Sequence, residues 1–508
     1  MNMKKTFTLL ALLLFPLFVL SQTYDVNLDA ITQKKFRVYK KGSEVKITSI
    51  MHKLNAESGN KVRTEYYATI GQDTVLIDKK FTEDLSFKVN TIQDMWDVAV
   101  IKHVLSELID NGSQESMRNE MEEEALEYIN KQKSYGMVFN DPCLENYIYG
   151  LIAKIIPNSM IDGRPSNINL LILDSPVTNA GMFPNGTLVI NTGLLSTLHT
   201  EDELVAVLSH EVAHFVLDHA VINVNKEASR KKRAEFWAGL ATAVTAVAEG
   251  IAASKNEYYV PGAATLGMAV LSTSIAVQVV ERLGMKYNHK QEEEADDMAM
   301  QTLEHLGYDK NALSTALNRM NQTMINERSS KMYFQSYTHP ALVERISKAG
   351  APYAKEDVKF EQEISFAVTS SARMKFEDRR FRQVLPLVNQ NIENRVATSE
   401  DYILKANCLL ALKNDAESNN EIIQLIEKAK ELDGSNINIY KSEILANIRL
   451  NKLYYVQELL NTYIQKLSEY GDSLNEIQNE DIWGDNYRFI VSERDWAKRM
   501  IIKIKSML

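Results

Sequence analysis

The chain has 508 residues, of which 45% are hydrophobic and 24% charged, and its formal net charge is -10 at pH 7. This is the composition of a globular protein, and the length suggests about three domains. An acidic chain without a large basic block is a poor partner for nucleic acid, so we expect no nucleic-acid binding. With only Cys143 and Cys408, the fold must be stable without a disulfide framework.

Residues 1–21 predict a secretory signal peptide. Two lysines precede an apolar run over 7–20 that is short for a membrane span, and Val19 and Ser21 are the small residues expected before a cut at Gln22. An uncleaved membrane anchor is the alternative. We therefore expect an exported protein.

Residues 22–90 predict a small β-rich module. The stretches EVKITSI, KVRTEYYATIG and DTVLIDKKF carry alternating or β-branched residues, and turns such as ESGN separate them. The module contains no histidine pair, nucleophile motif or metal spacing. We expect it to have a structural or docking role.

Helical patterns begin at about residue 92. Apolar spacing predicts helices over 93–110, 115–132 and 144–156, followed by two short strands in INLLILDSP and GTLVINTGLL. Helical spacing resumes at Glu201, where Thr200 is a suitable N-cap and Glu203 stands at the third helical position. The histidines that follow are therefore expected on a helix and not in a loop.

The stretch LSHEVAHFVLDHA carries a pattern typical of hydrolytic zinc sites. His210 and His214 are four apart, so on a helix they share a face and can bind one zinc through their ring nitrogens. Glu211 lies at the edge of the same site, where it suits a base for the attacking water better than a ligand. His219 is five residues after His214, about 140° away on a continuous helix, so we expect it not to bind this metal.

A third ligand must come from elsewhere, and the acidic stretch NHKQEEEADDMAM is the best source. Glu292 and Asp296 are four apart on a predicted helix, so Glu292 would complete coordination by two histidines and one glutamate. Asp296 would accept the second ring N–H of a zinc histidine and so fix its tautomer, and we expect that histidine to be His210. Spacing alone leaves Glu293 and Glu294 as rival ligands and a solvated acidic face as the alternative.

These motifs resemble the M48 family of zinc metallopeptidases over about residues 115–350. In that family HExxH is followed by a helix with Glu-x-x-x-Asp that usually ends in Ala-Asp, and alignment on Ala295-Asp296 implies Glu292 as the ligand. Asn288-His289 stand where the family often has Ser-Arg. The resemblance therefore does not predict whether the contacts with substrate change at these positions. Other matching elements are Asn179-Ala180, Gly193-Leu194-Leu195, Asp202-Glu203-Leu204, His339-Pro340 and Arg345.

The resemblance implies a gluzincin-type fold with one Zn²⁺ per chain and polypeptide substrates. Residues around Asn179, Ala180 and Phe183 would form an edge strand that pairs with the substrate backbone. His339 would either swing onto the open zinc position and keep the enzyme latent, or support a zinc ligand from behind or contact substrate. We expect Arg345 to be an ion-pair residue rather than an oxyanion stabiliser.

Two further segments bear on where the protein works. Residues 236–280 hold two runs rich in small residues around Pro261-Gly262 and predict an apolar helical hairpin. This hairpin would either touch a membrane or pack closely inside a soluble fold. Residues 353–508 predict short amphipathic helices, interpreted as a tetratricopeptide-like (TPR-like) helical region, with a plain bundle as the alternative.

We therefore expect a mainly helical α+β protein. The signal peptide together with the helical extension resembles the BepA-like periplasmic type. That type implies an endopeptidase for unfolded or misassembled envelope proteins, recruited to an envelope complex through its C-terminal helices. A normally latent protease that serves mainly as a binding or chaperone scaffold is the alternative. The expected parts are a signal peptide (1–21), a β-rich module (22–90), an M48-like zinc metallopeptidase domain (91–352) and a TPR-like helical region (353–508).

Overall fold

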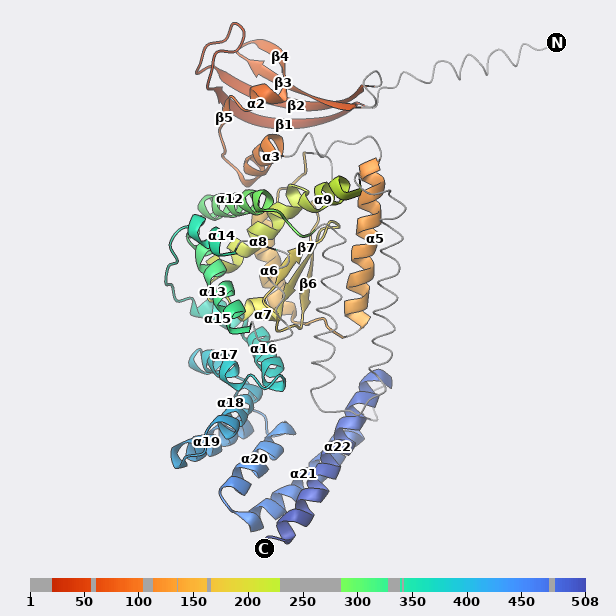
Figure 1. The fold of residues 1–508 in the computed structure, drawn as a ribbon, viewed down its shortest axis with the longest axis vertical. Helices are drawn as coiled ribbons and strands as arrows, with labels where there is room; N and C mark the ends of the chain where they lie inside the picture. Colours follow the sequence, from red (N-terminus) through yellow and green to blue (C-terminus); the bar gives the residue numbers. More distant parts are fainter. Residues whose placement is uncertain are drawn as a thin grey trace, which may run out of the picture.

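A computed structural model of the chain describes most of its residues. A five-stranded sheet lies at one end, the helices of the central domain lie in the middle, and the C-terminal helices lie at the other end (Figure 1). Residues 1–20 of the predicted signal peptide and the predicted 236–280 hairpin lie outside the described residues. The structure describes residues 21–55, 61–103, 113–134, 136–161, 166–228, 285–327, 339, 342–474 and 480–508.

The N-terminal sheet is antiparallel, with strand order β4-β3-β2-β1-β5. The β-rich character predicted for this part is confirmed, but its first strand was not predicted individually. A shift in register interrupts the pairing of β1 with β2 between Asp25 and Leu28. The elements are β1 (Ser21–Thr32), β2 (Glu44–Asn55), β3 (Lys61–Ile70), β4 (Asp73–Ile77), α2 (Lys79–Thr82) and β5 (Leu85–Phe87).

One hydrophobic core joins this sheet to the central domain. Helix α3 (Ile92–His103) lies between them and buries Trp96, whose indole N–H donates to the carbonyl of Ile155 at 2.7 Å. Buried residues of the sheet, such as Ile47 and Tyr66, belong to the same cluster as residues of the motif helix. The sheet is therefore packed as part of the molecule that carries the site.

The central domain contains a three-stranded sheet with strand order β6-β8-β7. Strand β8 pairs parallel with β6 and antiparallel with β7, so β7 is an edge strand of this sheet. The predicted strands in INLLILDSP and GTLVINTGLL are confirmed as β6 and β8. The elements before the motif helix are α5 (Ser113–Ser134), α6 (Pro142–Ile155), β6 (Asn169–Leu173), β7 (Ala180–Met182), β8 (Thr187–Asn191) and α7 (Thr192–Leu195).

The motif helix α8 (Glu201–Val216) begins as the sequence predicts. Thr200 Oγ1 accepts the backbone N–H of Glu203 at 3.1 Å, and Glu203 Oε2 accepts the N–H of His199 at 2.9 Å. Every residue of α8 from Asp202 onwards is buried. The helix ends before Asp218, whose φ of 57° lies in the left-handed region, and α9 (His219–Ala228) begins directly after it.

Helix α12 (His289–Leu306) packs against α8 and starts at a full capping box. Asn288 accepts backbone N–H groups of the first turn, and the Gln291 side chain accepts the N–H of Asn288 at 3.1 Å. The helix ends at Gly307, whose φ of 79° suits glycine. This cap places Glu292 in the first turn, beside the motif helix. The helices that follow are α13 (Ala312–Glu327) and α14 (Leu342–Lys348).

Every regular element described in the C-terminal part is a helix, and each helix from α16 onwards packs against the next (Figure 1). Phe360, Ile364, Ala367 and Val368 of the first two helices belong to the core of the central domain. The later helices form separate hydrophobic clusters. The helices are α15 (Val358–Glu363), α16 (Ser365–Glu377), α17 (Phe381–Glu393), α18 (Ser399–Leu412), α19 (Ala416–Leu432), α20 (Asn438–Arg449), α21 (Leu453–Leu474) and α22 (Glu480–Lys505).

Within the described residues, no single helix has both the length and the apolar character needed to cross a membrane. Only the bent pair of α8 and α9 passes that test on length and composition.

Candidate metal centre

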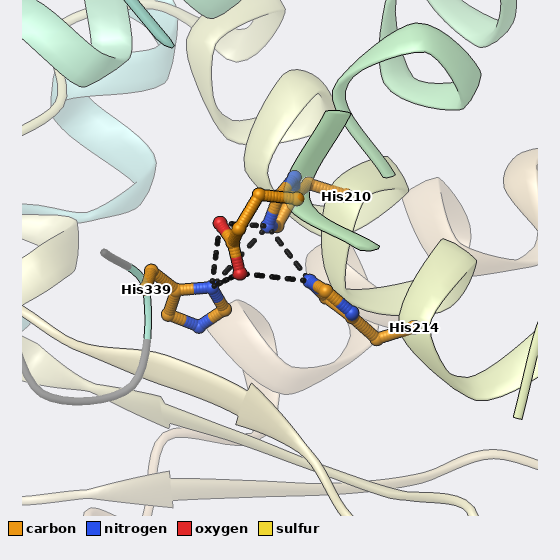
Figure 2. Close-up of side chains that lie close together, drawn as sticks. His210, His214 and His339 are labelled. Atoms are coloured by element: carbon orange, nitrogen blue, oxygen red, sulfur yellow. Dashed lines mark hydrogen bonds and ion pairs between the residues drawn. The ribbon is translucent and has the colours of Figure 1, made fainter. Parts of the chain in front are cut away.

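Four side chains from distant parts of the sequence meet where α12 packs against α8. One ligand-type atom from each of His210, His214, Glu292 and His339 lies within 4.8 Å of the other three. Figure 2 shows the three histidine rings turned towards one another, with His210 and His214 on one helix and His339 on a separate segment. The cluster thus joins the two motif histidines to a residue of α12 and to one that precedes α14.

The spacing of these atoms fits a tetrahedral zinc ion. His210 Nε2 lies 3.1 Å from His214 Nε2 and 3.4 Å from His339 Nδ1. Glu292 Oε1 lies 3.0 Å from His339 Nδ1 and 3.6 Å from His214 Nε2. Four ligands at the usual zinc distance of about 2.1 Å lie about 3.3 Å from one another, so these donors are already spaced for the ion.

The charge of the site also fits a divalent cation. Glu211, Glu292 and Asp296 bring three carboxylates against the one guanidinium of Arg345, and all four residues are buried. Uncompensated negative charges inside a protein are costly unless a cation accompanies them. Zinc would balance these charges, and imidazole with carboxylate is a ligand set that catalytic zinc sites use.

Glu211 lies beside the cluster without joining it. Its side chain is buried, and Oε1 lies 3.5 Å from His339 Nε2. The other oxygen, Oε2, makes no hydrogen bond within the described residues. A buried carboxylate oxygen of this kind, next to the ligand atoms, can accept a proton from a water molecule at the site.

Asp296 and Arg345 hold the outer side of His210 and Glu292. Asp296 Oδ1 lies 2.9 Å from His210 Nδ1, the ring nitrogen that faces away from the cluster. Arg345 donates to both oxygens of Asp296, at 2.7 and 2.8 Å, and its Nη1 lies 2.6 Å from Glu292 Oε2. Asp296 is thus placed against the outer ring nitrogen of His210, and Arg345 forms ion pairs with the carboxylates of Asp296 and Glu292.

The rival glutamates lie outside the cluster. Glu293 is half-exposed, and its Oε1 lies 3.2 Å from the ammonium of Lys348 on the protein surface. Glu294 points to the other side of α12, where Oε1 lies 3.2 Å from His103 Nδ1. Of the three consecutive glutamates, only Glu292 faces the motif histidines.

His219 is also outside the cluster, but it does not point away from His214. The two Nδ1 atoms lie 2.8 Å apart, because the chain bends at Asp218 instead of continuing as one helix. The 140° separation expected for a continuous helix does not apply here. The sequence offered little warning, because the residue with positive φ is an aspartate and not a glycine.

Tyr287 is a second neighbour of the site that the sequence did not reveal. Its ring stacks on His214 with centroids 3.6 Å apart and planes inclined by 10°. It belongs to the segment just before α12, and no motif or spacing marks it. Like the capping box at Asn288, it helps to fix α12 against the motif helix.

Burial and charge shift the pKa values of these groups in different directions. Burial lowers the pKa of His214 and His219, which favours the neutral imidazole. Burial alone would lower the pKa of His339, but the carboxylates of Glu292 and Glu211 raise it above its ordinary value. Burial alone would raise the pKa of Glu292, but the facing His339 and other cationic neighbours lower it.

A small cavity of about 30 Å³ opens next to the cluster and brings in part of the expected substrate strand. Asn179 and the first residue of β7, Ala180, line it together with Glu211. Phe183 does not line it; this residue is buried in the core and stacks obliquely on Tyr128 at 5.5 Å. The rest of the lining is largely apolar and was not predicted: Val207, Leu313, Leu317, Met320 and Leu342.

Comparison with known proteins agrees with this geometry. Residues 143–352 match the model of peptidase family M48. The chain is similar to a putative beta-barrel assembly-enhancing protease of Vibrio cholerae, with 27% identity over 222 residues, which are 43% of this chain and 41% of that protein. It is similar to the beta-barrel assembly-enhancing protease of Escherichia coli, with 25% identity over 225 residues, which are 44% of this chain and 41% of that protein.

A shorter region resembles a mitochondrial enzyme. It is 44% identical over 57 residues to the metalloendopeptidase OMA1 of Homo sapiens, which is 11% of each chain. The matched regions span less than half the length of these curated relatives. The family match includes all four members of the cluster and the glutamate beside it. The part of the chain that carries the cluster, residues 143–352, is therefore similar to peptidase family M48.

Proposed function

We propose that this protein is a zinc-dependent endopeptidase that holds one Zn²⁺ per chain. The observation that carries the proposal is the buried cluster of His210, His214, Glu292 and His339 with the carboxylate of Glu211 beside it. Two histidines four apart on a helix, a glutamate from a second helix and an adjacent glutamate base are the parts that water-activated peptide hydrolysis requires.

In the proposed reaction, the role of each residue follows from its position in the site. His210, His214 and Glu292 hold the zinc, which when bound supplies Lewis-acid polarisation of the scissile carbonyl and of the attacking water. Glu211 takes the proton of that water at its free oxygen and returns a proton to the leaving amine. Asp296 keeps the His210 proton on Nδ1, so that Nε2 presents its lone pair to the metal.

His339 is proposed to hold the enzyme in a latent state. Its Nδ1 faces the cluster and its Nε2 faces Glu211, so it takes up the position at which a water and a substrate carbonyl would have to meet. A substrate would therefore have to displace this ring before the reaction. Contact with bound substrate after that displacement is the other role open to it.

The substrate is proposed to be an extended or unfolded segment of polypeptide. Strand β7 lies at the edge of its sheet and borders the cavity at Ala180, so a substrate strand could pair with it and pass the zinc site. Once His339 is displaced and the small cavity widens, its apolar lining beside Glu211, with Leu313, Leu317 and Met320, would suit a hydrophobic side chain. Such side chains are buried in folded proteins and accessible in unfolded ones.

The physiological role is proposed to be quality control of envelope proteins in the periplasm. The names of two relatives refer to beta-barrel assembly, and residues 1–21 predict export. The TPR-like reading of the C-terminal helices, together with a groove of about 1160 Å³ among α16 to α22, supports recruitment of a client or of an envelope complex. Peripheral membrane contact through 236–280 stays a prediction.

A latent scaffold is the second candidate, because His339 lies in the cluster and the C-terminal groove offers a binding surface away from it.

One comparison separates the two functions. Zinc content and degradation of an unfolded test protein are measured for the mature chain and for its Glu211→Gln variant, which keeps every proposed ligand. We expect one zinc per chain in both proteins and cleavage of the test protein by the wild type alone. Zinc in each without cleavage favours the scaffold, and absence of zinc from both refutes the proposed site.

A further inference from the structure

The bend between α8 and α9 places a second histidine behind the zinc ligand His214. The two helices are inclined by 45°, and the residue between them, Asp218, has a left-handed backbone. Arg118 on α5 makes a bidentate ion pair with the Asp218 carboxylate, one contact being 3.1 Å. The bend is thus anchored from another helix, and its result is a distance of 2.8 Å between the Nδ1 atoms of His214 and His219.

The positions of the ring nitrogens determine which histidine donates. His214 presents Nε2 to the cluster, so a metal ligand at that atom carries its proton on Nδ1. Nδ1 of His214 then donates to Nδ1 of His219, which must be the unprotonated nitrogen of that ring. His219 accordingly carries its own proton on Nε2. This atom lies 3.3 Å from Glu294 Oε2, within ion-pair distance, although it makes no hydrogen bond within the described residues.

Glu294 is the carboxylate at the end of this chain, and it lies within ion-pair distance of two further basic side chains. Its Oε1 lies 3.2 Å from His103 Nδ1 on α3 and 3.2 Å from Lys290 Nζ on its own helix. His219 is 1% exposed, so no water competes strongly for its ring nitrogens. The arrangement repeats on the far side of the site, where Asp296 accepts from His210 at 2.9 Å.

We propose that His219 and Glu294 are positioning residues that fix the tautomer and ring orientation of the zinc ligand His214. This inference rests on the proposed zinc site. Acceptors behind ligand histidines raise the basicity of the ligand, and their loss costs about 10- to 100-fold in metal affinity. Nδ1 of His210 contacts the carboxylate of Asp296 directly. Nδ1 of His214 is connected to a carboxylate, that of Glu294, only through the neutral imidazole of His219.

A purely structural role is the competing explanation, because the carbonyl of His219 also accepts from Gln291 at 3.3 Å and its ring contacts Tyr287. Two variants of similar shape separate the roles. His219→Asn keeps an acceptor oxygen near the place of Nδ1, and His219→Leu removes it while filling the same space. His305→Leu removes an exposed histidine from α12 and is the control.

Zinc affinity of the full chain is measured by competition with a chromogenic chelator, and unfolding of the metal-free proteins is followed in parallel. We expect His219→Leu to lose about 10- to 100-fold in affinity and His219→Asn to stay within a few-fold of the wild type. Equal zinc affinity in the wild type and both His219 variants, or equal losses of zinc affinity in the two variants, would overturn the inference. A wild type that binds no zinc would instead refute the proposed function.

The wild type alone provides a second test that does not depend on how the variants fold. Nitrogen NMR of the zinc-loaded protein with ¹⁵N-labelled histidine reports which ring nitrogen carries each proton. The inference requires the proton of His214 on Nδ1 and that of His219 on Nε2. A His219 ring protonated at Nδ1 or at both nitrogens would contradict it.

Discussion

At the scale of single residues, His339 occupies the position on which latency depends. It reaches the cluster from the stretch between α13 and α14, whereas the other three ligand-type residues belong to the packed helices α8 and α12. Its ring lies between Glu292 and Glu211, at 3.0 Å from one carboxylate and 3.5 Å from the other. A residue in this place can exclude substrate without contributing to the support of the helices.

Replacement of His339 by alanine should therefore raise proteolysis several-fold while zinc remains bound. The three other candidate ligands keep their positions, and the coordination place beside Glu211 becomes open, as catalytic zinc sites require. Hydrolysis of an unfolded protein and zinc content give the readout. His289→Ala, which removes an exposed histidine at the start of α12, should behave like the wild type. Unchanged or lost cleavage with zinc still bound would reject latency.

At the scale of elements, α3 carries a buried carboxylate that makes its packing sensitive to pH. Burial raises the pKa of Asp97 to about 7, and only Gln93, donating at 2.8 Å, offsets the effect. The folded protein therefore keeps a proton that the unfolded chain releases above the ordinary carboxyl pKa. The stability associated with this proton is complete at low pH and is lost as the pH rises towards about 7.

Asp97→Asn should consequently stabilise the protein at pH 8, by on the order of 2 kcal/mol, and have little effect near pH 4. Thermal unfolding at the two pH values measures the difference. Asp94→Asn is the comparison on the same helix: it removes a charge that helps to raise the Asp97 pKa but weakens the acceptor of the Asn90 and Thr91 backbone N–H groups, so its gain at pH 8 should be smaller than that of Asp97→Asn. An equal effect of Asp97→Asn at both pH values would contradict the explanation by burial.

Local patterns in the sequence predicted the elements of the site, but not all of its contacts. The spacing of His210 and His214 and the cap at Thr200 depend on the geometry of one helix, which the chain determines over a few residues. The contact of His214 with His219 depends on a left-handed aspartate that α5 stabilises, and this is a tertiary effect. Strand β1 shows alternation at Val26, Leu28 and Ala30, although it was not among the strands predicted.

At the scale of the whole molecule, the division of the chain into hydrophobic clusters differs from the division that its local sequence patterns predict. The core around the candidate zinc site extends from the N-terminal sheet to α15 and α16, where Phe360 and Val368 are fully buried. Ion pairs reinforce this packing, as in the 2.6 Å contact of Lys355 with Asp202. Helices α18 to α22 pack around two further clusters, and a third, with Ala372, Leu404 and Cys408, links α16 and α17 to α18. The change from strand to helix that local patterns detect near residue 92 is therefore not a boundary of the core.

This division predicts that zinc stabilises only one part of the protein. All candidate ligands belong to the part that shares the central core, and an ion that binds the folded state stabilises it by about 2.7 kcal/mol at a hundredfold excess over its dissociation constant. Calorimetry of the full chain should show two transitions, of which a chelator lowers one by several degrees. A Glu292→Gln variant with weakened zinc binding should respond much less. A single transition, or equal shifts of both, would mean that the C-terminal helices fold together with the zinc-binding core.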